Sequence, residues 1–347
     1  MTELRNLLIV RLSSLGDIIH TLPAFQSLRA TFPSARIDWL VESRLAFFLG
    51  AVDGVDRILP IDTHSMRVRP LSFEAWRGLW APIRALRASH YDMAIDFQGL
   101  LKTAVLSRLS GAAIRVGFPK ALVRERPAHW FYHRSAPEPQ AQEHVVRLNL
   151  LLAETAGARS GDWRVPLKSI DSDRQAIENL FLPEQLTEYV VINPGGGWPT
   201  KRWHPVCYGQ LAARIQSEMR FRVVVTTGPG EDYLYAGIAA QCLDPPPVHL
   251  RVPFLQLIPL FRKARLVVAG DTGPLHLACA LGTPVVGLLG PTSPIRNGPW
   301  SANDEVVARR LSCSYCNGRS CPTSTECMDI PVAEVFAAVA RSLERRP

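Results

Sequence analysis

Val267–Pro294, which reads VVAGDTGPLHLACALGTPVVGLLGPTSP, is the stretch that decides the fold of this chain. An apolar strand ends at the small and polar residues Gly270–Gly273, and Pro274 then suits the first turn of a helix, where its missing N–H costs nothing. The helix stops at Gly282, and a second apolar strand covers 285–289. A strand whose polar end opens a helix is how α/β folds build sites for anions and nucleotides.

Four residues at the start of this predicted helix are candidates to bind a ligand: Asp271, Thr272, Gly273 and His276. In one interpretation, backbone N–H groups, the threonine hydroxyl and the imidazole donate hydrogen bonds to a diphosphate or a sugar. In the other, Asp271 or Thr272 caps a core helix and His276 is a structural residue. The stretch alone leaves both interpretations open.

The same order of strand, polar turn and helix recurs along the chain. Apolar strands are predicted over 6–12, 37–41, 55–61, 91–97 and 114–118 in the first half, and over 189–193, 222–227 and 248–250 in the second. Strands that alternate with helices predict a parallel sheet covered on both faces. Because a chain of 347 residues exceeds the usual size of one hydrophobic core, we expect two such domains.

The domain boundary is expected in the proline-interrupted segment 158–188. The first domain then covers residues 1–170, and a last helix at 331–347 is expected to return and pack on it. The second domain covers 171–330.

A run of three glycines, Gly195–Gly197, follows the first strand of the second half. Glycines allow a backbone to approach a ligand closely, and successive N–H groups in such a turn can cradle phosphate oxygens. Lys201 would add a positive charge for the same anion. A flexible turn with a solvated lysine is the alternative. Glu231 follows the next strand, where an acidic residue accepts ribose hydroxyls in dinucleotide folds or simply lies near a helix cap.

Asp17 lies directly after the first predicted strand, at the carboxyl end of the sheet. Such a carboxylate is either a helix cap, favoured by the helix dipole, or a catalytic group. As a catalyst it would be a general base that takes a proton from an acceptor hydroxyl.

The chain carries a net charge of +8, and much of the excess is arginine in the first half. This indicates an anionic partner, such as nucleic acid, a phosphorylated lipid or an acidic sugar, although solvated helix faces are an alternative. No apolar run is long enough to span a membrane, and the N-terminus lacks the form of a signal peptide. We therefore expect a cytoplasmic protein.

Four cysteines cluster near the C-terminus with the spacing C-x2-C-x4-C-x5-C: Cys313, Cys316, Cys321 and Cys327. A structural zinc site, disulfides and free thiols are all open interpretations, and none of them makes the cluster catalytic.

Several motifs occur together in order: SSLGDIIHTLPA at 13–24, DFQGLLK at 96–102, the Lys201 loop, DTGPLH at 271–276 and GPT at 290–292. With these motifs the chain resembles the bacterial lipopolysaccharide heptosyltransferases of the ninth glycosyltransferase family. The first two motifs look more like the members that add the first heptose. The cysteine cluster looks more like members that add later sugars.

The resemblance implies a GT-B fold, an α/β architecture of two Rossmann-like domains facing across a cleft. It also implies an inverting, metal-independent transfer of heptose from ADP-heptose to the inner core (Kdo or heptose) of lipopolysaccharide, without a cofactor. The acceptor would be Kdo-lipid A or heptosylated lipopolysaccharide, reached at the cytoplasmic surface of the inner membrane, to which the protein would bind peripherally.

The resemblance also assigns roles to residues. Asp17 is the expected base. The expected donor-binding residues are Gly195, Gly196, Gly197, Lys201, Glu231, Asp271, Thr272, Gly273 and His276. The expected acceptor-binding residues are Ser14, Gly16, Arg67, Arg69, Gln98 and Arg124.

Two alternatives remain at this stage. One is a related transferase that uses another nucleotide sugar or another acceptor. The other is a basic nucleic-acid-binding protein with a zinc module. The aromatic and basic residues around Trp130 are compatible with it. No recognised nucleic-acid-binding motif supports the second alternative, so we expect no nucleic acid partner.

Overall fold

The computed structural model describes residues 4–63, 65, 73–159, 165, 167–181, 188–242, 245–301 and 303–345, with the backbone alone for 73–79 and 181. The chain divides between Lys168 and Ser169 into two compact units.

The first unit is a six-stranded parallel sheet with the strand order β3-β2-β1-β4-β5-β6. Its strands are β1 Asn6–Val10, β2 Arg36–Glu42, β3 Arg57–Ile61, β4 Met93–Asp96, β5 Ile114–Gly117 and β6 Arg134–Ser135. Helices α1 Leu15–Thr31 and α6 Val145–Thr155 pack against each other, as do α5 Leu101–Leu109 and the short helix η2 Arg126–Phe131. The remaining helices are η1 Ser43–Leu45, α2 Ala46–Leu49 and α4 Phe73–Ala88.

The central strand β1 is buried because it carries apolar side chains toward both faces. Leu7, Leu8, Ile9 and Val10 have no exposed surface. This continuous run, rather than an alternation of apolar and polar residues, is typical of a parallel strand covered by helices on both sides. The sequence predicted β1 to β5 correctly. It missed β6, because 119–142 shows no clean period.

The second unit repeats the plan with the order β12-β11-β10-β7-β8-β9, again all parallel. Its strands are β7 Tyr189–Asn193, β8 Arg222–Thr226, β9 Val248–Leu250, β10 Leu266–Gly270, β11 Val285–Leu288 and β12 Glu305–Val307. Counted from the start of each unit, both sheets have the order 3-2-1-4-5-6 of the dinucleotide-binding fold. The order reverses between β1 and β4 in one sheet and between β7 and β10 in the other, and ligands bind at such switch points.

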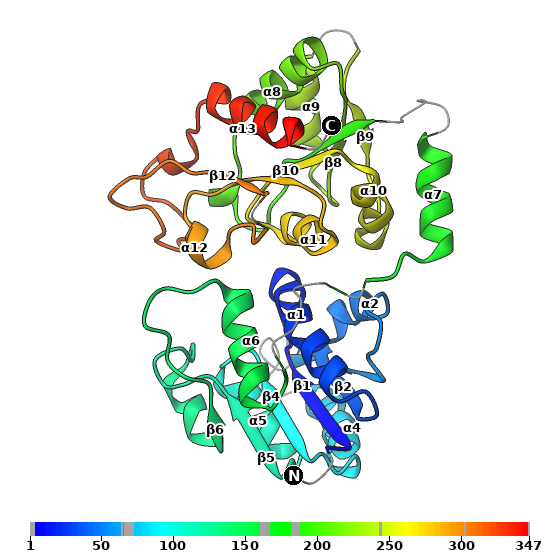
Figure 1. Ribbon diagram of the computed structural model, residues 1–347, viewed down its shortest axis with the longest axis vertical. Helices are drawn as coiled ribbons and strands as arrows, with labels where there is room; N and C mark the ends of the chain where they lie inside the picture. The colour runs from blue at the N-terminus through cyan, green and yellow to red at the C-terminus, as the bar shows by residue number, and fades with distance from the viewer. Residues whose placement is uncertain are drawn as a thin grey trace. The chain divides into compact units, whose positions relative to one another are not determined.

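The helices of the second unit form two layers over the sheet (Figure 1). Helices α8 Pro205–Glu218, α9 Asp232–Ala239 and α13 Val332–Glu344 pack in one layer. Helices α7 Asp171–Phe181, α10 Leu257–Lys263 and α11 Gly273–Leu281 pack in the other. The shorter helices are η3 Pro199–Lys201, η4 Phe254–Gln256, α12 Pro294–Asn297 and η5 Glu326–Met328.

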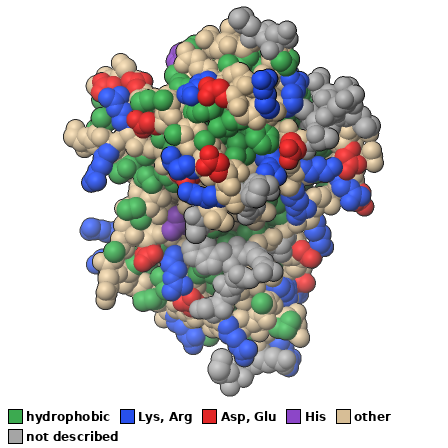
Figure 2. Space-filling view, turned by 45° about the horizontal axis from the view of Figure 1, so that its top comes forward, with side chains coloured by type: hydrophobic (Ala, Val, Ile, Leu, Met, Phe, Trp, Pro, Cys, Tyr) green, Lys and Arg blue, Asp and Glu red, His purple; other side chains and the backbone are tan. Residues whose placement is uncertain are grey.

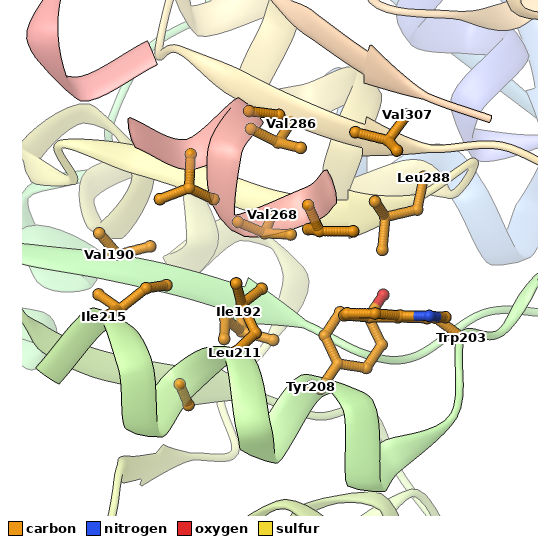
Figure 3. Packing of buried hydrophobic residues seen from close by; sticks show 14 of the residues in the cluster. Val190, Ile192, Trp203, Tyr208, Leu211, Ile215, Val268, Val286, Leu288 and Val307 are labelled. Carbon is orange, nitrogen blue, oxygen red and sulfur yellow. The ribbon is translucent and has the colours of Figure 1, made fainter. Parts of the chain in front are cut away.

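The core between α8 and the second sheet is built from aliphatic strand residues and two large aromatic rings (Figure 3). Trp203 and Tyr208 pack edge to face with ring centroids 4.9 Å apart, and both are almost completely buried. The indole N–H of Trp203 donates to the Ile330 carbonyl at 3.0 Å. This bond ties the chain just before α13 to the start of α8.

Helix α13 lies on the second unit, which corrects the expectation that the last helix returns to the first domain. Its apolar residues Val335, Ala338 and Val339 are fully buried in the same core as Trp203, and the helix packs against α8 and β12. The physical reason is that α13 is amphipathic. Its apolar stripe is buried against the sheet of the second unit, which directly precedes it in the chain.

Cationic side chains are spread widely over the drawn face of the molecule (Figure 2). Within the described residues, no helix is long and apolar enough to cross a membrane. The cysteines Cys313, Cys316, Cys321 and Cys327 are free thiols, three of them exposed. Among the residues that the structure describes, no three His, Cys, Asp or Glu side chains converge in a way that would hold a metal ion.

Candidate active site

Asp17 occupies the switch point of the first sheet, in the first turn of α1. The backbone N–H and the hydroxyl of Ser14 each donate to its Oδ2 at 3.0 Å, which holds the carboxylate over the helix N-terminus. Its Oδ1 lies 2.7 Å from the Nη2 of Arg11 and 3.5 Å from the Nη2 of Arg124. Asp17 is thus both the cap that the sequence allowed and the centre of a charged cluster.

Two guanidinium groups keep Asp17 ionised. Burial alone would raise the pKa of its carboxyl group, but Arg11, then Arg124, and the Ser14 N–H outweigh that effect and hold the pKa well below its usual range. The carboxylate side chain is still 19% exposed. A partly exposed carboxylate whose ionised form is favoured is therefore present at this edge of the sheet.

Arg11 is the buried member of this cluster. It follows β1 directly, is 3% exposed, and also donates through Nη1 to the Phe97 carbonyl at the end of β4. Burial lowers the pKa of its guanidinium, and Asp17 opposes that effect. Arg11 was not among the candidates from the sequence, although an arginine within the otherwise apolar run 6–12 was the signal available.

The turn after β4 is held by side chains rather than left open for a ligand. Asp96 is fully buried and accepts from Gln98 N at 2.8 Å, Thr103 Oγ1 at 2.8 Å and Tyr132 OH at 2.7 Å. Gln98, 3% exposed, accepts from Leu12 N at 2.8 Å and so joins the turns after β4 and β1. Gln98 thus positions the Asp17 turn in this structure, and its expected role in acceptor binding stays a prediction.

Three of the remaining expected acceptor residues lie in described parts of the first unit, and two do not. Ser14 and Gly16 lie in the first turn of α1 beside Asp17. Arg124 has its backbone N–H bonded to the Gly99 carbonyl at 2.9 Å, and its side chain is 48% exposed. Arg67 and Arg69 lie outside the described residues.

The second charged cluster lies at the switch point of the second sheet. The ammonium group of Lys201 is 2.7 Å from Asp271 Oδ2, and His276 Nε2 is 2.9 Å from Asp271 Oδ1. Lys201 also lies 4.3 Å from the centre of the Trp198 ring. Lys201 comes from η3 after β7, and Asp271 and His276 come from the β10–α11 turn, so the parallel pairing of β7 with β10 brings them together.

The carboxylate of Asp271 is paired with Lys201 and His276 and, when ionised, offers no donor to an anion. Burial alone would raise its pKa, but the hydrogen bond and charge of His276, then Lys201, hold the pKa well below the usual range. Asp271 is 4% exposed. Its carboxylate therefore holds the side chains of Lys201 and His276 at this edge of the sheet, beside the start of α11.

Thr272 and Gly273 open helix α11. Thr272 is the N-cap residue by its backbone angles, but its side chain makes no capping hydrogen bond and donates instead to the Gly270 carbonyl at 3.2 Å. The first N–H groups of α11 therefore lack a side-chain acceptor from Thr272. Such a helix N-terminus favours an anion.

The glycine turn after β7 packs against Glu231. A side chain at Gly195 would place its Cβ 2.3 Å from Glu231 Oε2, so glycine is required there by close approach. Glu231 accepts from Gly196 N at 3.2 Å and from Gly228 N at 2.9 Å. The Gly196 N–H is thus already used in this structure, and of the three glycines Gly197 is the exposed one.

Arg202 completes this corner and was missed by the sequence analysis. Its Nε donates to the Gly196 carbonyl at 2.8 Å, its Nη2 lies 3.4 Å from Glu231 Oε1, and its Nη1 donates to the hydroxyl of Tyr233 at 2.6 Å. It follows Lys201 directly in the sequence, and no pattern distinguishes it from a solvated arginine. Only the packing of the β7 and β8 turns gives it partners.

The cysteine segment touches the Lys201 loop. Thr200 Oγ1 donates to the Gly318 carbonyl at 2.8 Å, and the guanidinium of Arg319 lies 5.0 Å from the centre of the Trp198 ring. The segment therefore supports η3 from the side of Trp198, whatever the state of its thiols.

Comparisons with known proteins identify the family of the chain. The family model described as glycosyltransferase family 9 (heptosyltransferase) matches residues 79–326. Over 90% of its length the chain is 31% identical to lipopolysaccharide heptosyltransferase 1 of Pseudomonas aeruginosa, covering 86% of that protein. It is 28% identical to lipopolysaccharide heptosyltransferase 1 of Escherichia coli, over 86% of this chain and 92% of that one.

Solved structures give the same result for the fold. E. coli heptosyltransferase WaaC with ADP matches with a TM-score of 0.76 and 25% identity, over 97% of this chain and 99% of that chain. A family 9 glycosyltransferase from Veillonella parvula matches with a TM-score of 0.84 and 19% identity, over 98% of each chain. These matches confirm the expected GT-B fold class and the family resemblance of the sequence motifs.

Proposed function

The chain belongs to glycosyltransferase family 9 and is a glycosyltransferase, and from this premise we propose that it transfers heptose from ADP-heptose to the inner core of lipopolysaccharide, onto Kdo or heptose. Its relatives are named lipopolysaccharide heptosyltransferases, and WaaC was solved with ADP and with ADP-2-deoxy-2-fluoro heptose. The observation that carries the proposal is the pair of charged clusters, one at each switch point. The first contains the ionised carboxylate of Asp17, and the second contains the ammonium group of Lys201, which is paired with Asp271.

In the proposed reaction the second unit binds the donor. Lys201, His276 and the N-terminus of α11 would face the diphosphate, with Thr272 and Gly273 supplying the first donors of that helix. Negative charge develops on the diphosphate as the glycosidic bond breaks, and fixed positive groups stabilise it best in the transition state. The proposed transfer therefore needs no metal. Glu231 with the Gly195–Gly197 turn would contact the nucleoside part.

Asp17 would act as the general base. Its carboxylate accepts the proton of the acceptor hydroxyl while that oxygen bonds to the anomeric carbon of heptose. The bond from the anomeric carbon to the diphosphate oxygen breaks, and the electron pair leaves with ADP. Attack from the side opposite the leaving group inverts the anomeric centre.

Arg124 would link acceptor binding to the strength of the base. It lowers the pKa of Asp17 and is half exposed, so an anionic group of the acceptor can draw its guanidinium away from the carboxylate. Losing that contact would raise the pKa of Asp17 and make it a better base when the acceptor is present. Ser14, Gly16, Arg67 and Arg69 remain proposed acceptor residues.

The proposed acceptors, Kdo-lipid A and heptosylated lipopolysaccharide, are phosphorylated lipids that carry acidic sugars. The basic character of the chain fits such a partner. We propose that the enzyme works in the cytoplasm, peripherally bound at the inner membrane.

A transfer assay tests this function directly. Purified protein would be given ADP-heptose and a set of lipopolysaccharides truncated at defined core sugars, with ADP release and acceptor mass as readouts. We expect transfer to one of the inner-core acceptors and none with UDP-glucose in place of ADP-heptose. Transfer from another nucleotide sugar alone would replace the donor assignment.

A further inference from the structure

A basic and aromatic surface on the first unit takes no part in the chemistry described above. Between residues 119 and 135 the chain contains four cations, Lys120, Arg124, Arg126 and Arg134, and one carboxylate, Glu125. Glu125 accepts a hydrogen bond from Leu101 N at 2.7 Å. We call the exposed residues Lys120, Arg126, Trp130 and Arg134 of this segment the η2 surface.

Trp130 is the most exposed large apolar side chain among the described residues. Its exposed fraction is 79%, against 61% for Trp80 and 60% for Ile295. An indole ring has a large apolar area and a single N–H donor, and such a side chain is most stable at the boundary between water and an apolar medium. Its exposure therefore calls for a partner.

The segment presents Trp130 rigidly. On its C-terminal side the Tyr132 hydroxyl donates to the buried Asp96 at 2.7 Å, and Arg115 Nε donates to the Phe131 carbonyl at 2.7 Å. The Tyr132 ring packs so closely on Gly117 that a Cβ there would lie 2.3 Å from it. On its N-terminal side Arg124 N donates to the Gly99 carbonyl. The indole thus projects from an anchored helical turn.

We propose that the η2 surface docks the enzyme on an anionic lipid bilayer, with Trp130 inserted at the headgroup level and the surrounding cations paired with lipid phosphates. Tryptophan is enriched at membrane–water interfaces, and clusters of lysine and arginine bind anionic leaflets. This deepens the proposed function, on which it rests for the lipid nature of the acceptor, by naming the surface that meets the membrane.

The composition of the surface favours a bilayer over a nucleic acid. Single-stranded nucleic acids bind to several exposed rings on which successive bases stack. Here Trp130 is the one Phe, Tyr or Trp side chain of the segment that is exposed, since Phe131 and Tyr132 are half-buried and the Tyr132 hydroxyl is bonded to Asp96. One inserted ring in a segment with several exposed cations matches a lipid surface instead.

The segment also reaches the proposed base. Arg124 lies between the turn after β4 and the exposed helix η2, and its guanidinium contacts Asp17 at 3.5 Å. A bilayer bound at η2 would therefore hold lipid headgroups near the residues that are proposed to bind the acceptor. Docking and acceptor capture would then use one continuous segment of chain.

Vesicle co-sedimentation of the full-length protein tests the proposal. The vesicles would be phosphatidylcholine alone and phosphatidylcholine mixed with phosphatidylglycerol, at low and high salt. We expect salt-sensitive binding to the anionic vesicles, weakened about tenfold in Trp130→Ala by the loss of its buried apolar area. Arg126→Ser and Arg134→Ser should each weaken binding by about fivefold. Phe47→Ala, an exposed aromatic residue outside this segment, is the matched control and should bind like the wild type.

Two readouts separate this proposal from the proposed function. Transfer to a deacylated, water-soluble core acceptor should be unchanged in Trp130→Ala, while transfer to vesicle-embedded acceptor falls. If the wild type binds anionic vesicles through Trp130 but transfers no heptose to any acceptor, the η2 surface stands and the proposed function fails. Equal vesicle binding by Trp130→Ala and the wild type, or binding of an oligonucleotide in place of vesicles, would overturn the docking surface.

Discussion

At the scale of single residues, the chemistry depends on how charges are paired. Asp17 and Asp271 are both carboxylates at strand ends, and both have pKa values held below the usual range by neighbouring cations. They differ in exposure, since the Asp17 side chain is 19% exposed and that of Asp271 is 2% exposed. A reacting hydroxyl can therefore reach Asp17, whereas Asp271 serves to fix Lys201 and His276.

Replacing Asp17 tests its role as the base. Asp17→Asn keeps the shape and the Ser14 contacts but cannot take the proton, so kcat should fall by about 10²–10⁴-fold. The affinity for ADP should stay unchanged in calorimetry, because the proposed donor residues lie in the other unit. A variant with near-normal kcat would remove Asp17 as the base.

Arg11 sets the protonation of Asp17, and a pH profile measures this. In the wild type the depressed pKa of Asp17 contributes stability that is complete above the unfolded-state value of about 3.9 and is lost as the pH falls toward the folded-state value. Arg11→Met removes a positive charge that opposes the effect of burial on Asp17. The pKa of Asp17 should therefore rise, and the acid limb of the kcat/KM profile should move to higher pH.

The control for this effect is Arg29→Met. Arg29 is also largely buried in the first unit and pairs with Asp56, so its loss costs general stability without touching Asp17. Both variants should unfold at lower denaturant concentration than the wild type, but the acid limb should move in Arg11→Met alone. If the acid limb of the kcat/KM profile lies at the same pH in both variants, Arg11 has a purely structural role.

At the scale of elements, both clusters form where a strand, a tight turn and a helix N-terminus meet. β1 delivers Arg11 and the Ser14–Asp17 turn, while β7 and β10 deliver Lys201 and Asp271. Because β7 and β10 pair in parallel, their polar ends lie at one edge of the sheet. The turns themselves are locked by side chains such as Gln98 and Glu231, so the site geometry belongs to the scaffold.

Lys201 lies beside the N-terminus of α11, and replacing it should weaken donor binding. Lys201→Ala removes the cation proposed to face the diphosphate, so the Kd for ADP and the KM for ADP-heptose should both rise, by about tenfold or more. Lys263→Ala is the matched control, because Lys263 is a lysine of the same unit that pairs with Glu178 at the surface. Unchanged ADP affinity in Lys201→Ala would count against the phosphate contact.

The glycine turn makes a prediction about stability. Gly195→Ala would drive a methyl group into Glu231, which must shift and lose its bonds to Gly196 and Gly228, so the free energy of unfolding should fall by about 1–3 kcal/mol. Gly197→Ala meets no atom within 4 Å and should change stability little. Denaturant unfolding of both variants, with far-UV circular dichroism as the probe, measures the difference.

At the scale of the whole molecule, the chain uses one architecture twice and places a different cluster of charged side chains on each copy. Both sheets have the order 3-2-1-4-5-6, counted from the start of each unit, and both place their cluster at the switch point. The first presents an ionised base beside arginines, and the second presents a lysine at a helix N-terminus. This division suits a transferase whose acceptor and donor differ in chemistry.

Hydrogen exchange with and without ADP tests the division. ADP at about 100 times its Kd should stabilise the unit that binds it by about 2.7 kcal/mol. Slower exchange is expected in the Lys201 loop and the first turn of α11, and unchanged exchange in β1 and α1. Protection confined to the first unit would reverse the donor assignment.

The sequence by itself determined the fold class and the location of both candidate clusters. Apolar runs ending in Gly-rich or polar turns predict buried parallel strands, because burial on two faces requires continuous apolar residues. Asp17, Lys201 and the Asp271–His276 stretch lie in the segments that follow such strands, so their place at the carboxyl edge of a sheet could be predicted from local order alone. The motif resemblance then predicted the family, and the comparisons confirmed it.

Only the tertiary structure decided which groups pair. Arg11 meets Asp17 and the end of β4 because β1 and β4 are neighbours in the sheet, although Phe97 is far along the chain. The same holds for Arg202 with Glu231, and for α13, which joined the second core rather than the first. Local sequence sets where strands and helices begin, but long-range packing chooses their partners, and those partners fix the pKa values on which the proposed chemistry depends.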